Sequence, residues 1–447
     1  MCSIIPNVFF AVRNAVLFAA AALAAFAFCS CEGDAGYAAA KPAFANPAAR
    51  PIRVLLSEGK SAEVSSQSGA NVSSSSGAEV SRGVSGTLKF EASSGKVKYK
   101  GGLSDEFTVV PAGGGFLVWN GSPYRGMIRV KSGGKGVMVI NVLDVDEYLR
   151  GVVPAEVPYT WPMESIKAQA VAARTYAVSR MIAKETNSWD VVATTADQVY
   201  NGVKAEHPET DAAVAQTAGE IAIYEGKPII AYYHADSGGF TKQGSAPYLK
   251  PVPSPAPNSP YSTWEVSWTP DELRAVLDAA KLPGGEILGI DAPVDETGRC
   301  VGVTITTSKA SFGMTAHEFR KIAGISTVKS TMFDLKFEGG IAWDKETPFA
   351  GHQKLSLQGK FKSGERKVRE TYVSGKSTIK PAPKQMTALG QRFKPARIVL
   401  RGSGYGHGTG MSQWGAMYMA SQGKNYLDIL LHYYTGVSIV KMEDVME

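Results

Sequence analysis

The sequence predicts an α+β fold: a β-rich N-terminal module at residues 52–145, followed by a mixed α+β core at 146–437. Short runs of alternating apolar residues, separated by Gly, Ser and Asn, fill the first segment and are typical of strands. After Trp161-Pro162, apolar residues recur at three- and four-residue steps, which indicates a long helix after the loop expected to carry catalysis. Strand and helix patterns then occupy separate stretches, as in α+β proteins.

The first 40 residues predict a secretion leader. One positive charge precedes an unbroken apolar run at residues 15–28, which is too short to cross a bilayer comfortably. Two processing routes stay open: lipid attachment at a cysteine, where Cys31 fits better than Cys29, or cleavage after residues 38–40. Either route predicts an exported protein of the periplasm or cell envelope that reaches the membrane only through its leader or a lipid anchor.

Composition and charge exclude several classes of protein. The chain has 447 residues, of which 44% are hydrophobic and 20% charged, so it is not disordered throughout. Residues 41–51, rich in Ala and Pro, are expected to form a tether. The formal charge is +6, and the excess lies in a basic insertion at residues 351–397, interpreted as a solvated loop or hairpin. Because no base-reading or stacking motif accompanies it, nucleic-acid binding is not predicted.

Cysteine usage excludes a disulfide framework and a cysteine-rich metal site. Three of the four cysteines belong to the leader, which leaves Cys300 in the folded body. Cys300 lies in an apolar-flanked run and is expected to be a buried strand residue rather than a nucleophile.

The β-rich module contains one ambiguous stretch, the Ser-rich segment 65–85. Val64, Val72 and Val80 recur there at eight-residue steps. The repeat is too short for a solenoid, so the segment is interpreted as loops between short strands.

The core is expected to begin with a helix over residues 163–184. Its predicted buried stripe repeats at helical spacing: Ile166, Ala170, Ala173, Ala177 and Met181. Further patterns predict helices at 208–219, 270–281, 315–323, 412–422 and 425–434, a hairpin of 221–224 with 228–233, and a surface loop at 251–260.

Glu156 is the strongest catalytic candidate. It stands between Pro154 and Pro158, immediately before the long predicted helix. Apolar neighbours are expected to desolvate its carboxyl and raise its pKa toward that of a useful general acid. The alternative is that Glu156 only caps the helix beginning near Pro162.

A second candidate is the glycine-rich run 401–416. Its first five glycines alternate with single side chains, so the backbone can approach a ligand while Tyr405, His407, Gln413 and Trp414 project toward it. Aromatic faces and amides suit sugars. A phosphate loop is disfavoured because no Gly-Lys-Ser/Thr ending follows. Taken alone, His407 is more typical of a structural histidine.

A third cluster contains His234, Asp236 and Ser237. A serine-hydrolase triad is disfavoured because the Gly-x-Ser-x-Gly elbow is missing and the three positions are adjacent. A metal site made with His407 has no diagnostic spacing to support it.

Together these runs resemble the SpoIID/LytB family, stage II sporulation protein D. The resemblance covers residues 52–437 and rests on motifs in a fixed order: Pro154-Ala155-Glu156-Val157-Pro158, the segments 167–176 and 234–241, Asp197-Gln198-Val199-Tyr200, and Gly404–Ala416. The family's best-studied members are lytic transglycosylases that cleave peptidoglycan glycan between N-acetylmuramic acid and N-acetylglucosamine. Other members are described as amidase enhancers.

The resemblance implies that Glu156 is the catalytic glutamate. It also implies contacts with glycan strands from Lys167, Arg174, Tyr200, Ser237, Tyr405, His407 and Gln413. Family members with zinc use a Cys/His pair, and no cysteine stands near residues 197–207, so neither a metal site nor any other cofactor is predicted.

Three functions stay open on this basis. A lytic transglycosylase needs one carboxylate, since the muramic 6-hydroxyl displaces the leaving sugar and closes a 1,6-anhydro ring; peptide-stripped strands are the expected substrate. The main alternative is a non-catalytic glycan binder that enhances an N-acetylmuramoyl-L-alanine amidase. A hydrolase would need Asp236 or Asp197 as a second carboxylate.

Overall fold

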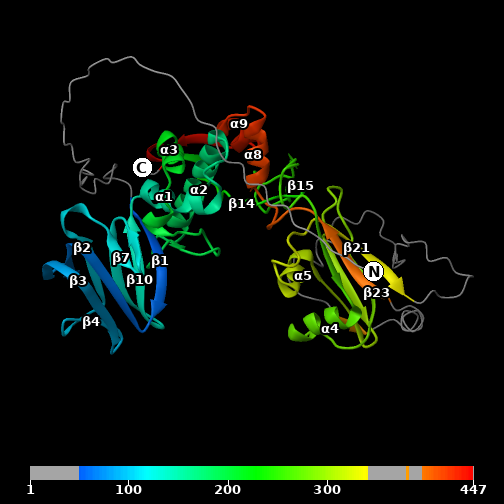
Figure 1. Ribbon diagram of the computed structural model, residues 1–447, viewed down its shortest axis with the longest axis horizontal. Coiled ribbons are helices and arrows are strands. Elements are labelled where there is room, and N and C mark those ends of the chain that lie inside the picture. The colour runs from blue at the N-terminus through cyan, green and yellow to red at the C-terminus, as the bar shows by residue number, and fades with distance from the viewer. Residues whose placement is uncertain (1–49, 341–378, 382–394, 446–447) are drawn as a thin grey trace, which may run out of the picture. The chain divides into compact units, whose positions relative to one another are not determined.

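The computed structural model describes residues 50–340, 379–381 and 395–445, and Figure 1 shows their arrangement. It confirms a mixed α+β fold with a β-rich N-terminal part. The leader with Cys31, residues 41–49 of the tether and nearly all of the basic insertion lie outside the described residues. Within these three ranges, no helix combines the length and apolarity needed to span a bilayer.

The N-terminal module is a large, mostly antiparallel sheet with the strand order β11-β1-β10-β9-β6-β2-β3-β4-β5, onto which the β7–β8 hairpin pairs through β2. Its strands are β1 (Ile52–Gly59), β2 (Ser61–Ser74), β3 (Glu79–Ser93), β4 (Lys96–Tyr99), β5 (Gly102–Ser104), β6 (Glu106–Pro111), β7 (Leu117–Trp119), β8 (Ser122–Tyr124), β9 (Met127–Gly133), β10 (Gly136–Leu143) and β11 (Val191–Val192). Alternate side chains such as Phe90, Val109 and Val130 face inward and form the module's own core.

The Ser-rich stretch corrects the expectation of loops. It forms most of β2 and the first part of β3, which pair antiparallel with register shifts between Ser66 and Ser73. Val64 and Val72 are fully buried, because an eight-residue step along one strand keeps both on the same face. The residues between them are small or polar, so the sequence lacks the large apolar side chains that usually indicate a strand.

Helix α2 (Met163–Ala183) lies at the centre of the core, beside α1 (Val145–Glu156) and α3 (Pro208–Gln216) in Figure 1. The predicted stripe is confirmed: all five residues are buried against α1, α3 and β1. A second face, which includes Ala168, Val171 and Ala172, packs against α8 (Gln413–Ser421) and α9 (Tyr426–Tyr433). The helix is therefore buried on two sides, and its alanines allow close approach.

The remaining residues form small sheets and a lobe with its own core. The lobe contains α4 (Pro270–Ala279), α5 (Ala316–Ala323) and two sheets, with the orders β17-β23-β21 and β18-β19-β20-β22. Their strands are β17 (Trp264–Trp268), β18 (Ile287–Asp291), β19 (Gly302–Thr307), β20 (Ala310–Thr315), β21 (Phe333–Gly340), β22 (Ile379–Pro381) and β23 (Pro395–Gly402). Cys300 is buried there, as expected, in a bridge to Val294 just before β19, and burial raises the pKa of its thiol to about 12.

Short strands complete the core. The predicted hairpin is β12 (Glu220–Tyr224) with β13 (Lys227–Pro228), and β12 also pairs with β25 (Ser438–Lys441). Two further pairs are β14 (Tyr233–His234) with β24 (Met411–Ser412), and β15 (Gly239–Phe240) with β16 (Pro253–Ser254). The last pair lies partly inside the expected loop 251–260, and Ser254 is fully buried.

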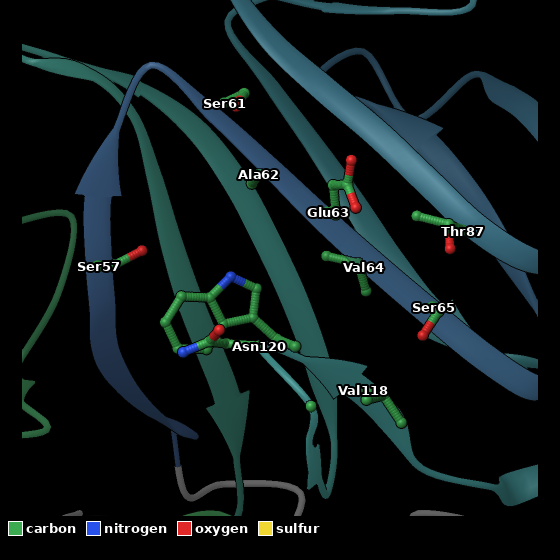
Figure 2. Close-up of a pocket in the computed structure, with 11 residues that line it drawn as sticks. Ser57, Ser61, Ala62, Glu63, Val64, Ser65, Thr87, Val118 and Asn120 are labelled. Atoms are coloured by element: carbon green, nitrogen blue, oxygen red, sulfur yellow. The ribbon is translucent and has the colours of Figure 1, made fainter.

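A polar cavity of about 380 Å³ opens in the N-terminal module (Figure 2). Side chains of β1 and β2, Thr87 of β3 and Asn120 of the β7–β8 turn line it. None of the lining residues is a predicted site residue, so this cavity is separate from the candidate catalytic residues.

Candidate functional site

Glu156 is the last residue of α1, and this placement corrects the expectation that it lies on a loop. Asp144 caps the start of the helix, and its side chain accepts hydrogen bonds from the Asp146 and Glu147 amides. It ends at Glu156 because Val157, the residue before Pro158, is extended, as residues before proline prefer to be. The carboxyl therefore projects from a fixed helix end.

Three groups from distant segments hydrogen-bond to the Glu156 carboxyl. Gln413 Nε2, from the first residue of α8, lies 3.3 Å from Glu156 Oε2. The Tyr233 hydroxyl and the backbone of Val199 supply the other two bonds. The carboxyl is thus held from α8, β14 and the segment before residue 200.

A second set of hydrogen bonds orients Tyr233. The Tyr148 hydroxyl donates to Gln198 Oε1 over 3.2 Å, and Gln198 Nε2 donates to the Tyr233 hydroxyl over 3.1 Å. Tyr233 accepts from Gln198, so its own proton is directed at Glu156. The Tyr148–Gln198–Tyr233 chain links the first turn of α1 to the carboxyl at its end.

Desolvation raises the pKa of Glu156 above the ordinary glutamate value of 4.5, against the three hydrogen bonds, which favour the carboxylate. A carboxyl in this state suits a group that first gives and then takes a proton. The expectation of a raised pKa from apolar surroundings thus has a structural basis.

The third cluster and the glycine-rich run pair with each other along their length. Tyr233 and His234 pair in parallel with Met411 and Ser412, and Asp236 pairs with Tyr405 through two backbone hydrogen bonds of 2.8 and 2.9 Å. The two segments, far apart in sequence, are therefore held side by side by a short parallel pair and two isolated bridges, an arrangement called here the ladder, and Gln413 follows directly after it.

The alternating glycines allow the two paired segments to approach each other closely. A Cβ atom on Gly410 would lie 2.0 Å from the carbonyl oxygen of Tyr232, and one on Gly408 would lie 2.9 Å from the guanidinium carbon of Arg299. Both glycines also have positive φ. The close approach that the spacing predicts is thus made by the protein's own segments.

His407 is half-buried within the ladder. Its Nδ1 accepts the Thr409 amide proton over 3.1 Å, and its ring lies edge-on to Tyr232 and 5.3 Å from His234. Burial lowers the pKa of His407 to about 4 and that of His234 well below 6.5, so both rings are neutral at neutral pH.

Two of the predicted glycan-binding residues are buried in structural roles. Arg174 is fully buried, and its guanidinium bonds to Asp146 Oδ1 at 2.6 Å and to the carbonyl oxygens of Glu220 and Val214. Tyr200 is 4% exposed and donates to Asn141. In this structure Arg174 and Tyr200 support the site from behind and do not present a surface to a ligand.

Three other predicted glycan-binding residues differ from one another in burial and in contacts. Lys167 is half-buried, pairs with Glu164 at 2.8 Å and lies over the ring of Tyr426. Ser237 is fully buried, whereas the half-buried Tyr405 stacks on Tyr261 with ring centroids 4.8 Å apart. A glycan role for Lys167 or Tyr405 stays a prediction, and Ser237 has no exposed surface to offer.

The two alternative carboxylates already accept hydrogen bonds within the protein, although Asp236 Oδ2 is buried without a partner. Asp197 accepts from the Tyr176 hydroxyl at 2.8 Å and from the Val192 amide at 2.9 Å, and it lies 3.4 Å from Arg180. Asp236 is buried and accepts from the Gly238 amide. Among the residues that the structure describes, no group of three or more His, Cys, Asp or Glu side chains could hold a metal ion.

Sequence reasoning missed two residues of the site, Tyr233 and Gln198. Gln198 stands inside a run that carried the resemblance, and Tyr233 directly precedes another. Nothing in the spacing indicates that Tyr233 meets Glu156 or that Gln198 bonds to Tyr233, because both contacts depend on tertiary packing.

Comparisons with known proteins concern the sequence of the chain. A family model described as SpoIID, stage II sporulation protein, matches residues 133–224, a range that contains Glu156, Lys167, Arg174 and Tyr200. An uncharacterised protein of Brachyspira hyodysenteriae is 30% identical over 76% of this chain and 78% of its own length.

Two relatives carry functional names. The amidase enhancer of Bacillus subtilis is 30% identical over 65% of this chain and 40% of its own length. Stage II sporulation protein D of Bacillus amyloliquefaciens is 28% identical over 68% of this chain and 76% of its own.

Proposed function

The chain belongs to the SpoIID/LytB family, and from this premise we propose that it is an exported lytic transglycosylase that cuts peptidoglycan glycan strands with Glu156. The names of its relatives point to a role at the cell wall. The observation that carries the enzymatic proposal is the Glu156 carboxyl, which combines a raised pKa with three hydrogen bonds from three segments.

In the proposed mechanism Glu156 acts twice. Its protonated carboxyl first gives a proton to the glycosidic oxygen between N-acetylmuramic acid and N-acetylglucosamine. The resulting carboxylate then accepts the proton of the muramic 6-hydroxyl as this oxygen bonds to the anomeric carbon. The products are a free N-acetylglucosamine 4-hydroxyl and a 1,6-anhydro ring, so no water is consumed.

The hydrogen bonds around Glu156 suit both steps. Gln413 and Tyr233 steady the carboxylate that forms after the first transfer, and the helix end holds it in one orientation. Because Asp197 is tied to Tyr176 and Val192, a second carboxylate for hydrolysis is not free at that position.

The test is the end chemistry of purified glycan strands, with and without stem peptides, incubated with the mature protein and with a Glu156→Gln variant. We expect anhydro-muramic ends from the wild type and a loss of at least about 100-fold in the variant, the range for removing a general acid/base. Undiminished cutting by Glu156→Gln would contradict the assignment, and reducing ends would favour a hydrolase.

A second candidate function is a glycan-binding enhancer of a cell-wall amidase, favoured by the name of the Bacillus subtilis relative. It predicts that the wild type binds strands without shortening them and that Glu156→Gln behaves identically. Faster peptide release by an added amidase, equal for both proteins, would support this alternative.

A further inference from the structure

An exposed aromatic stack lies three residues beyond Glu156. Tyr159 is 48% exposed, and its ring lies face to face with the imidazole of His207, with centroids 3.7 Å apart and planes 12° apart. The stack takes no part in the hydrogen bonds around Glu156.

The stack is fixed to the end of α1 that carries Glu156. Tyr159 follows Pro158, whose carbonyl accepts the Trp161 amide over 3.1 Å and so closes a turn. His207 precedes the first turn of α3 and pairs with Glu209. Arg150 of α1 binds Asp211 of α3 at 2.5 Å, which ties the two helices together; they are neighbours in Figure 1.

The position puts Tyr159 within reach of a ligand at Glu156. Three residues of chain span at most about 11 Å, so a polymer bound at the carboxyl is long enough to reach the ring as well. A second aromatic pair, Trp161 and Trp414, lies edge to face at 4.9 Å, and Trp414 directly follows Gln413. Aromatic residues therefore stand in the chain segment that follows Glu156 and directly after Gln413, which bonds to it.

The exposure of Tyr159 favours a ligand over a purely structural role. A stack that only held the turn would gain most from burying both rings, yet nearly half of the Tyr159 side chain faces water. Its backing by His207 keeps the ring in one orientation, which lowers the entropy lost when a flat ligand binds.

We propose that the Tyr159–His207 stack is a sugar-binding platform, which holds a pyranose ring of the glycan strand next to the bond positioned at Glu156. The platform rests on the proposed function, because it assumes the same polymer at the same site. Its ligand is the apolar face of an N-acetylated hexosamine ring.

The test measures calorimetric affinity for peptide-free glycan strands in the Glu156→Gln background, where no cutting disturbs binding. Added Tyr159→Ala and Tyr159→Leu should each weaken binding by about tenfold, because leucine keeps apolar area but offers no flat face. Tyr159→Phe should bind within about twofold of the parent. Phe116→Ala, which removes a ring that is 41% exposed and lies just before β7, is the matched control and should not change affinity.

Different results would contradict the sugar-binding role of Tyr159 and the proposed enzymatic function. Parent-like affinity of Tyr159→Ala and Tyr159→Leu would overturn the platform, whether or not the wild type cuts. If the wild type binds but never shortens strands, the enzyme proposal fails while the Tyr159 dependence of binding still stands. No binding by the parent would overturn both. Unchanged thermal midpoints separate lost binding from unfolding, and with Glu156 intact a higher KM at similar kcat is expected.

Discussion

The Glu156 carboxyl is subject to two opposing effects. Burial disfavours its charged form, whereas bonds from Gln413, Val199 and Tyr233 favour it, and the balance leaves its pKa raised. Stronger bonds would keep the group ionised at working pH, and weaker ones would leave the carboxylate unsupported after proton transfer. Tyr233 matters here because its own acceptor capacity is filled by Gln198.

Replacement of Tyr233 by phenylalanine tests this balance through the pH dependence of cutting. A general acid works only when protonated, so the rate should fall as pH rises through the raised pKa of Glu156. Tyr233→Phe removes a bond that favours the carboxylate, which raises this pKa further and moves the alkaline limb to higher pH. The measurement is kcat/KM against pH for both proteins; a limb that stays in place or moves to lower pH would contradict the assigned role of Tyr233.

At the scale of elements, α2 positions the site because it is packed on two sides. One face meets α1, which ends at Glu156, and the other meets α8, which begins at Gln413. The buried alanines set the distance between these helices, because larger side chains would push them apart.

Enlarging a buried alanine of α2 should therefore destabilise the fold. Ala172→Leu adds volume to a fully buried position and is expected to lower the free energy of unfolding by about 1–3 kcal/mol. Ala183→Leu makes the same change at the exposed last residue of the helix and should stay within about 0.5 kcal/mol of wild type. Urea denaturation of both variants gives the comparison; equal stability would mean that the helix packs more loosely than described.

The sequence predicted the elements better than their contacts. The apolar residues of 163–184 recur at three- and four-residue steps, and this repeat within one helix predicted both α2 and its buried stripe. The Ser-rich strands were missed because serine is a weak strand former and Val80 ended up exposed. Two prolines drew attention to Glu156, whose catalytic role stays a prediction. The burial of Arg174 and Tyr200 depends on tertiary packing, which the sequence pattern does not reveal.

At the scale of the whole molecule, a buried arginine joins the lobe of α4 and α5 to the ladder. Arg299, 2% exposed, donates from Nη2 to the carbonyl oxygens of Ser237 and Phe240, each at 2.7 Å, and from Nη1 to Thr331. Its guanidinium also lies against Gly408. Burial lowers its pKa to about 10, which still leaves it charged at neutral pH.

Loss of this cation should loosen the ladder that carries Gln413. Arg299→Met keeps apolar volume but leaves two buried carbonyls without their donor, so we expect a loss of about 2–4 kcal/mol in the free energy of unfolding. Arg82→Met, at a side chain that is 79% exposed and paired on the surface, is the control and should change stability little. If Arg299 joins the two parts, the variant should also cut glycan more slowly well below its unfolding midpoint, since Gln413 is then less firmly held at Glu156. Unfolding at the wild-type urea concentration together with wild-type cutting would show that the lobe and the ladder are held together by other contacts.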